Sequence, residues 1–395
     1  MKKLLMMIVL CAVLCTIAAV MVGCAQPSHE ASSPDRATSQ NVVVGSTPEQ
    51  YERVGLSKGA VDIHEDGYNT LGADGTYEWW YFDCSLDDGS SLVVTFYTRS
   101  MMAPDSELNP FVTLALTNPD GTVVNERVSV TAEGFTSSTE QCDITLGDCT
   151  ARGDLKNYQV VFANDAIQAT IDLQSNVQSW RPESGYRFYG DGQEYYSAWL
   201  CVVPEGTVAA HITYEGQEHV VAGTGYHDHN WGNHPVWQLQ NDWYWGRVEA
   251  GPYVAINSYI TAAQTYGFES FDVFMLAKDG TVIADDPEKV QFSPADVEID
   301  EQTGIPIAST LRYVYIDGDT EYQVTYTLRK TILATSMLGA LTDDEQDKAS
   351  QDGDQMMYYR FIGDAQIDVY EKGILIESQT TDSALWELMY PGVVR

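Results

Sequence analysis

Residues 223–234 contain several side chains that are able to take part in catalysis, and they read Gly-Thr-Gly-Tyr-His-Asp-His-Asn-Trp-Gly-Asn-His. They include three of the chain's seven histidines, and four of the nine tryptophans lie between Trp231 and Trp245. Histidine is the side chain whose charge changes most readily near neutral pH. Small-molecule sites are typically apolar pockets with a few polar groups. The segment is therefore predicted to carry the functional site.

The order of residues within this segment suggests how its roles are divided. If the stretch is an extended strand, successive side chains point to opposite faces. His227, His229 and Trp231 then share one face, and Asp228 and Asn230 share the other. We expect the histidine face to line the pocket, with His229 transferring a proton and Asp228 and His227 assisting it.

A second aromatic segment, residues 77–83, reads Tyr-Glu-Trp-Trp-Tyr-Phe-Asp, so Glu78 would share a face with Trp80 and Phe82. Indole and phenol faces attract cations, so such residues can stabilise a carbocation. The alternative is that these aromatic residues form core and strand pairs. The residues predicted to bind substrate are Tyr226, Trp231, Glu78, Trp79, Trp80, Tyr81, Trp243, Trp245, Asn257 and Tyr259.

Other kinds of site are less well supported. His227, Asp228, His229 and His234 have the side chains of metal ligands, but a His-x-His pair on a strand needs a further ligand from elsewhere. The sequence has neither a glycine-rich phosphate loop nor a Gly-x-Ser-x-Gly turn. We therefore predict neither a metal nor a cofactor.

The N-terminus resembles an export signal, with Met-Lys-Lys followed by an apolar run and then Gly23-Cys24. Residues 20–24 resemble the lipobox of bacterial lipoproteins, which implies a signal peptide over 1–23 and a lipid on Cys24. An uncleaved membrane helix is the alternative. Residues 24–55 are predicted to contain the lipidated cysteine and a flexible tether. The protein is thus expected at the extracytoplasmic face of the cell membrane, held by its lipid.

The net charge of −36 excludes nucleic-acid binding by charge neutralisation. Four cysteines follow Cys24, and outside the cytoplasm they are able to form disulfides. Cys142 and Cys149 are close enough in sequence to staple a loop, but the pairing among Cys84, Cys142, Cys149 and Cys201 stays open.

Short alternating or aromatic runs separated by Asp-Gly turns predict an all-β protein, with a short helix around Thr331–Leu341 as the exception. Four matches recur in order with a period near 160 residues. They pair Trp79–Phe82 with Trp243–Gly246, Phe111–Leu116 with Phe271–Leu276, Tyr158–Phe162 with Tyr322–Tyr326, and Tyr195-Tyr196 with Tyr358-Tyr359. We expect two barrels, over 56–235 and 236–395, because closure removes sheet edges. The tail of the second copy keeps a tryptophan, Trp386, but has no histidine.

The motifs Glu-Trp-Trp-Tyr-Phe and Asp-His-Asn-Trp-Gly, with residues 199–206 between them, resemble the carotenoid 1,2-hydratase and AttH-like superfamily. The resemblance runs from about Asp62 to the end. It implies a tandem duplication of two lipocalin-like antiparallel β-barrels, and it maps the family's His-x-Trp pair onto His229 and Trp231. Members include polyprenoid hydratases and pericyclases.

One departure from that family concerns the proton donor. The hydratases are expected to have a carboxylic acid on the strand after the second tryptophan motif, but residues 252–260 offer only Asn257 and Tyr259. Either Asp228, Glu78 or Glu249 takes this role, or the protein does not hydrate alkenes.

These observations predict an enzyme of the hydratase or isomerase type. It would act without a cofactor on an isoprenoid or other apolar polyene-like molecule in a cleft between the barrels. A non-catalytic lipoprotein that binds lipids or other hydrophobic ligands is the alternative, and a pericyclase-type cyclase is a third. The sequence predicts no particular protein partner.

Overall fold

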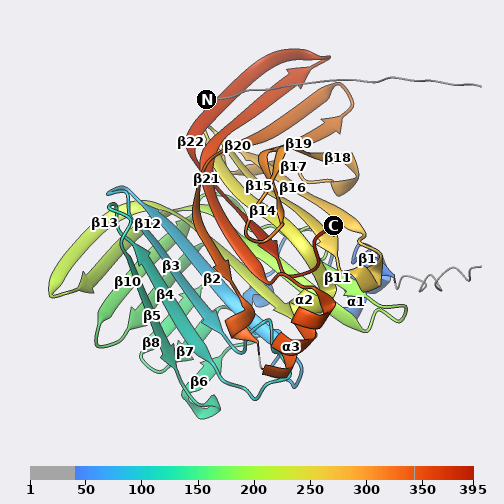
Figure 1. Cartoon of the computed structure of the whole chain (residues 1–395). Coiled ribbons are helices and arrows are strands. Elements are labelled where there is room, and N and C mark those ends of the chain that lie inside the picture. The colour runs from blue at the N-terminus through green and yellow to red at the C-terminus, as the bar shows by residue number, and fades with distance from the viewer. Residues whose placement is uncertain (1–40, 342) are drawn as a thin grey trace, which may run out of the picture. The chain divides into compact units, whose positions relative to one another are not determined.

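The structure is a computed structural model that describes residues 41–341 and 343–395 (Figure 1). The predicted signal peptide, the lipidation at Cys24 and the start of the tether lie outside the described residues. The described residues belong to one compact unit. Within them, no helix combines the length and the apolar character that crossing a membrane requires.

The fold is all-β, as predicted, and is built from two antiparallel sheets. The first has 13 strands in the order β5-β4-β3-β2-β13-β12-β10-β9-β8-β7-β6, with β11 pairing to β12 and β1 pairing to β11. Its strands are β1 (Val42–Val44), β2 (Tyr77–Leu86), β3 (Ser91–Tyr97), β4 (Phe111–Thr117), β5 (Val123–Ser129), β6 (Phe135–Ser137), β7 (Asp143–Leu146), β8 (Cys149–Gly153), β9 (Asn157–Ala163), β10 (Ile167–Ser175), β11 (Tyr186–Tyr189), β12 (Tyr195–Tyr214) and β13 (Gln217–Gly232).

The second sheet has nine strands in the order β17-β16-β15-β14-β22-β21-β20-β19-β18. Its strands are β14 (Gln240–Ala250), β15 (Tyr253–Ala262), β16 (Ser270–Lys278), β17 (Thr281–Ala284), β18 (Val290–Ile299), β19 (Pro306–Asp317), β20 (Thr320–Ser336), β21 (Met357–Glu371) and β22 (Ile374–Tyr390). The α-helices are α1 (Pro48–Arg53), α2 (Val236–Leu239) and α3 (Asp343–Asp352). Short 3-10 turns cover Ile63–Asp66, Ala132–Gly134, Gln264–Tyr266, Pro287–Lys289 and Leu338–Ala340.

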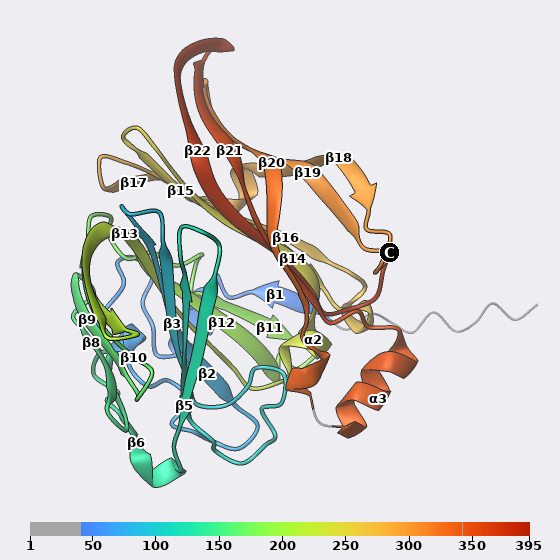
Figure 2. The same ribbon diagram turned by 60° about the vertical axis from the view of Figure 1, so that its left-hand side comes forward.

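The alternation of side chains explains why these sheets have cores. In β10, the buried side chains are those of Ile167, Ala169, Ile171 and Leu173, and the residues between them are exposed or half-buried. Each sheet is curled, as Figure 2 shows. The buried side chains of each sheet form a separate core. A third cluster joins β12 and β13 to β15 and β16, so the outer faces of the two sheets also pack together.

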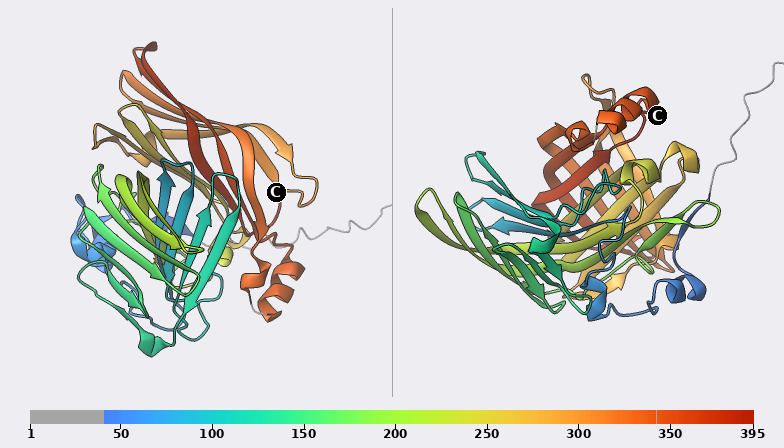
Figure 3. Two further views of the ribbon diagram at one scale, coloured as in Figure 1. Left: turned by 90° about the vertical axis from the view of Figure 1, so that its left-hand side faces the viewer. Right: turned by 90° about the horizontal axis from the view of Figure 1, so that it is seen from below.

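Three of the four repeat matches fall on strands that occupy equivalent places. β2 and β14 lie beside β13 and β22, and the pairs β4/β16 and β12/β21 also correspond. Figure 3 shows the two sheets from two further sides, the first in blue to green and the second in yellow to red. The fourth match is wrong, because β9 is separated from β12 by β10 whereas β20 pairs directly with β21. By its place in the sheet, β20 corresponds to β10, so this match is displaced by one strand.

The strand register also corrects the alignment of the two tails. His227 pairs with Phe82 in the first sheet, and Trp386 pairs with Gly246 at the equivalent place in the second. Trp386 is therefore the counterpart of His227, and not of Trp231. In the first sheet Phe82 and His227 stack on each other. In the second sheet Gly246 and Trp386 occupy these two places, and a Cβ on Gly246 would lie only 2.9 Å from the Trp386 Cβ. The glycine thus leaves room for the large indole.

Two predicted segments differ from the structure. The predicted tether is too long, because its last part has regular structure. Val42–Val44 pair with β11, and α1 begins with a capping box between Thr47 and Gln50. The predicted helix around Thr331–Leu341 is wrong, since β20 continues to Ser336 and pairs with β21, and the helix lies at Asp343–Asp352.

The suggested Cys142–Cys149 disulfide is absent, and all four cysteines of the described chain are free and buried. The Cys149 thiol contacts Ala163 of the neighbouring strand β9, with the Ala163 amide nitrogen 3.3 Å from Sγ. Cys142 instead lies near Asp66 and His227. The two thiols therefore have separate surroundings although they are close in sequence.

Candidate active site between the sheets

The two faces of β13 lead to different parts of the molecule, as the predicted alternation requires. His229 and Trp231 point into the core of the first sheet, and His227 lies beside them, stacked on Phe82. Tyr226 points the other way, into the cluster that joins the two sheets, and its hydroxyl bonds Asp228. The face of β13 that carries His227 and His229 therefore lines the inside of the first sheet, and not a cleft between the two sheets.

His229 is held between two carboxylates inside the first sheet. Its Nε2 donates to Glu78 Oε1 at 2.8 Å, and its Nδ1 lies 3.3 Å from Asp66 Oδ1. Burial by itself lowers the pKa of His229, but the hydrogen bonds and charges of Asp66 and Glu78 outweigh burial and raise it to about 9. His229 thus carries a positive charge at neutral pH.

Glu78 and Trp80 also contact their neighbours in this buried cluster. Glu78 accepts hydrogen bonds from the backbone amides of Asn69 and Thr70 and from the Thr70 hydroxyl. The Trp80 ring stacks on His229 with centroids 4.4 Å apart. Because both His229 and Glu78 are fully buried, this arrangement orders the interior of the first sheet.

His227 and Asp66 form the second half of the cluster. His227 Nδ1 lies 2.9 Å from the Tyr81 carbonyl oxygen, and its Nε2 lies 3.3 Å from Asp66 Oδ2. The Tyr158 hydroxyl donates to the same Asp66 oxygen at 2.6 Å. Burial would raise the pKa of Asp66, but His227 and His229 hold it well below its usual range.

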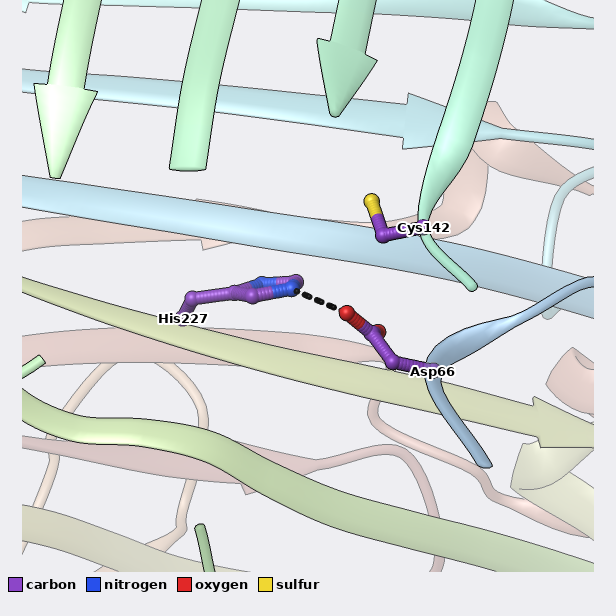
Figure 4. Close-up of side chains that lie close together, drawn as sticks. All are labelled: Asp66, Cys142 and His227. Atoms are coloured by element: carbon purple, nitrogen blue, oxygen red, sulfur yellow. Dashed lines mark hydrogen bonds and ion pairs between the residues drawn. The ribbon is translucent and has the colours of Figure 1, made fainter. Parts of the chain in front are cut away.

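Asp66, Cys142 and His227 are also the three groups whose ligand atoms lie within 4.8 Å of one another (Figure 4). A histidine that binds metal through one nitrogen commonly bonds a carbonyl through the other, as His227 does. However, Asp66 Oδ2 is already occupied by Tyr158 and His227. Burial also raises the pKa of Cys142 well above its ordinary value, while metals bind the thiolate. We assign this cluster to hydrogen bonding and ion pairing.

The opposite face of β13 presents a different carboxyl group. Asp228 Oδ2 accepts from the Tyr226 hydroxyl at 2.8 Å and from Trp199 Nε1 at 3.0 Å, and Oδ1 accepts from Asn230 at 2.8 Å. Burial raises the pKa of Asp228 to about 6, although these hydrogen bonds oppose the change. Asp228 is thus a carboxyl group that is protonated in a substantial fraction of molecules near pH 6.

Ion pairs join the sheets next to Asp228. Arg360 of β21 contacts Asp83 of β2 at 2.8 Å, and Arg247 of β14 lies 3.5 Å from the same carboxylate oxygen. Glu387 of β22 lies 3.9 Å from Arg360, and burial raises its pKa. The charge of Glu387 also contributes to the raised pKa of Asp228.

Sequence reasoning missed Glu387, Asp66, Asp83 and Arg360. Glu387 is more than 150 residues from Asp228 in the chain, so only the packing of two sheets brings them near each other. One signal was present, because Glu387 is the single acid in the otherwise apolar end of β22, Ala-Leu-Trp-Glu-Leu-Met-Tyr. A lone acid in such a run is unusual unless it has a partner.

The structure separates the predicted binding residues into three groups. Tyr81 and Trp245 lie between the sheets beside Tyr226, and the Tyr226 and Trp245 ring centroids are 5.1 Å apart. Trp243 packs at the edge of the same cluster, and Trp79 stacks on Tyr77. Glu78, Trp80 and Trp231 lie inside the first sheet. Asn257 and Tyr259 belong to the second sheet, where they contact Tyr326 and Phe292.

Comparisons with solved structures support the fold. An AttH structure from Nitrosomonas europaea matches with a TM-score of 0.54 at 17% identity, over 84% of this chain and 97% of that one. CghA in complex with Sch210972 matches with a TM-score of 0.56 at 16% identity, over 80% of this chain and 89% of that one. Kievitone hydratase from Nectria haematococca matches with a TM-score of 0.51 at 11% identity, over 84% and 93%.

Comparisons of sequence give more distant relatives and a family. Hydroxyneurosporene dehydrogenase of Chlorobaculum tepidum is 24% identical over 224 residues, which cover 47% of this chain and 57% of that protein. The quinolone epoxide rearrangement protein AsqO of Emericella nidulans is 24% identical over 200 residues, covering 45% and 52%. The chain thus spans about half the length of the curated relatives it matches.

These relatives and structures confirm the resemblance to the carotenoid hydratase and AttH-like superfamily that the aromatic motifs indicate. The Diels-Alderase-like family matches residues 68–303, which is more than half of the chain. That range includes both aromatic motifs, the whole of β13 and the first strands of the second sheet. The chain therefore belongs to the Diels-Alderase-like family.

Proposed function

We propose that this protein is an enzyme that moves a proton onto an apolar small molecule bound between the two sheets. Asp228 is the proton donor in this proposal. The observation that carries it is the position of Asp228, which is a buried carboxyl with a pKa raised to about 6 beside Tyr226 and Trp199. A general acid works best when its pKa lies near the working pH.

Asp228 suits this role better than His229, which the sequence favoured. His229 is enclosed by Asp66, Glu78 and Trp80, and the pKa of about 9 keeps its proton bound. Asp228 is 8% exposed and faces the second sheet. His227 and His229 then act as positioning residues, because they fix β13 from its other face.

Glu387 supplies a second carboxyl group from the second sheet. An acid-catalysed addition of water needs a donor for the alkene and an acceptor for the proton that the water loses. Asp228 would donate and Glu387 would accept, and Arg360 holds Glu387 in place. The faces of Tyr226 and Trp245 are suited to stabilising the carbocation between the two steps.

The similar proteins agree with this type of chemistry. One is named a hydratase and another an epoxide rearrangement protein, and both reactions depend on proton transfer. For this chain we infer a hydratase or isomerase that needs no cofactor and acts on an isoprenoid or polyene-like molecule. A lipid on Cys24 would hold the enzyme at the extracytoplasmic face of the membrane, where such substrates dissolve.

The test uses the protein incubated with a lipid extract of its source, followed by mass spectrometry of the retained and released molecules. Wild type should convert a polyene-like molecule to a product that is one water heavier or isomeric. Asp228→Asn keeps the hydrogen bonds from Tyr226 and Trp199 but has no proton to give, so turnover should fall roughly 100-fold or more while retention persists. The wild-type rate should decline as the pH rises through about 6.

A matched control is Asp354→Asn, because burial also raises the pKa of Asp354 to about 6, but this residue lies near α3. It should leave turnover unchanged. Equal turnover by wild type and Asp228→Asn would refute the role of Asp228. Retention of an unaltered molecule by both proteins would instead favour a carrier that binds hydrophobic ligands without converting them.

A further inference from the structure

A pocket of about 170 Å³ lies inside the second sheet, away from the site between the sheets. Its walls are mainly aromatic and apolar, and Tyr259 and Phe292 stack in it with centroids 4.4 Å apart. The lining residues are Asp242, Tyr244, Tyr259, Phe292, Pro294, Val297, Pro306, Ala308, Leu388, Tyr390 and Arg395. These residues form the second-sheet pocket.

The second-sheet pocket corresponds to the charged cluster of the first sheet. Tyr244 pairs with Leu388, just as Trp80 pairs with His229. Asp242 precedes Tyr244 by two residues, as Glu78 precedes Trp80. The duplication therefore places a pocket in one sheet where the other sheet has its buried histidine.

In the first sheet the chain itself fills this place. The Tyr68 ring packs against Trp80 with centroids 6.2 Å apart and against Phe135 at 5.5 Å. Asn69 and Thr70 then bond the carboxylate of Glu78. The Tyr68 ring therefore fills the core of the first sheet, and the two residues that follow it hydrogen-bond Glu78.

In the second sheet the segment before β14 is directed elsewhere. Val236 and Trp237 of α2 pack in a cluster with Met102 and Met356, and Leu239 packs with Tyr266. None of these α2 residues lines the second-sheet pocket. The described chain therefore supplies no counterpart of Tyr68 from this segment.

The size and chemistry of the pocket indicate what fits. A protein cavity of about 150 Å³ holds one benzene molecule, so this pocket has room for one aromatic ring. At its edge, the Arg395 side chain is 39% exposed, and its guanidinium lies 3.4 Å from Asp242, 3.3 Å from Thr261 and 5.3 Å from the centre of the Phe268 ring. It is thus able to donate to an oxygen on a ligand.

We propose that the second-sheet pocket is a separate binding site for a molecule with a single aromatic ring and a carboxylate or carbonyl oxygen. The ring occupies the place that Tyr68 fills in the first sheet, and stacks beside Tyr259 and Phe292. The oxygen accepts a hydrogen bond from Arg395. This site does not depend on the chemistry proposed for Asp228.

The test measures binding of benzoate and of toluene to the full chain by saturation-transfer NMR and calorimetry. Both should bind saturably, and benzoate more tightly. Val297→Trp places a large side chain at the rim, where Val297 is half-exposed, and should weaken both ligands at least tenfold. Val220→Trp, at an exposed position on the first sheet, is the matched control and should change neither.

Arg395→Gln should reduce benzoate affinity to that of toluene and leave toluene unchanged. Arg312→Gln, on the exposed side of β19, should have no effect on either. Thermal unfolding of each variant verifies that it is folded. The proposal is overturned if wild type binds neither ring saturably, or if Val297→Trp binds both as wild type does. Loss of benzoate in Asp228→Asn but not in Val297→Trp would place the ring between the sheets instead.

Discussion

The surroundings of two adjacent titratable residues on β13, Asp228 and His229, raise the pKa values of both for different reasons. The imidazole of His229 is kept charged because Asp66 and Glu78 contact it on both sides, and the carboxyl of Asp228 is kept partly neutral because burial outweighs its hydrogen bonds. Alternation along the strand sends one into the core and the other toward the second sheet. The same short motif thus provides a structural charge and a candidate acid.

The charge on His229 predicts a pH dependence of stability. Its folded pKa of about 9 lies above the unfolded value near 6.5, so its contribution is complete below about pH 6.5 and is lost as the pH rises through 9. We expect the free energy of unfolding to fall by on the order of 2–3 kcal/mol over this range, measured by urea unfolding at several pH values.

His229→Gln should remove this pH dependence and lower stability by roughly 3–5 kcal/mol, because Glu78 would lose its positive partner and Asp66 would keep only its contact with His227. His211→Gln is the control, since His211 contacts Glu218 at the exposed surface. A His229→Gln protein with the same slope as wild type between pH 6.5 and 9 would show that another group is responsible.

At the scale of elements, the site depends on the close pairing of β2 with β13. These two strands carry both aromatic motifs, and ten residue pairs hold them in register from Gly223↔Leu86 to Gly232↔Tyr77. Glycine at position 223 allows the approach, because a Cβ there would overlap the Ser85 carbonyl oxygen and lie 2.9 Å from the Leu86 Cα. A slip of one residue would exchange the faces of His229 and Asp228.

Gly223→Ala should therefore destabilise the protein by roughly 2–3 kcal/mol, since neither backbone is free to move away. Gly339→Ala is the matched control, because a Cβ at that position meets nothing within 4 Å. Thermal unfolding of the two variants makes the comparison. Equal melting temperatures would mean that the β2–β13 pair tolerates a wider spacing than the structure shows.

At the scale of the whole molecule, buried ion pairs determine how the two sheets meet. Asp83 is fully buried and is shared by Arg360 and Arg247, both from the second sheet. Removal of one charge from such a group leaves the others uncompensated in a poorly solvated place. The interface that holds Asp228 and Glu387 is thus sensitive to the loss of a charge.

A double-mutant cycle tests this arrangement. Asp83→Asn should lower stability by roughly 3–5 kcal/mol, and the coupling energy with Arg360→Gln should be about 1–3 kcal/mol. The exposed pair Arg329 and Asp364 serves as the control, with an expected coupling below about 1 kcal/mol. Equal coupling in both pairs would contradict a role for Asp83 in joining the sheets.

The sequence alone determined the all-β class, the duplication and the two faces of β13. These properties are local, since they depend on alternation, turn residues and a repeated order of motifs. The resemblance to the carotenoid hydratase and AttH-like superfamily followed from short motifs for the same reason. Their spacing in the chain is visible without knowledge of any contact.

Tertiary structure alone decided which face of β13 is closed and which meets the second sheet. Asp66 lies 161 residues before His227 and contacts it, while Arg360 follows Asp83 by 277 residues and pairs with it. It also decided that Cys142 and Cys149 do not pair, and that the second sheet keeps a pocket where the first contains Tyr68. Such contacts depend on how two curled sheets pack, and no local pattern encodes them.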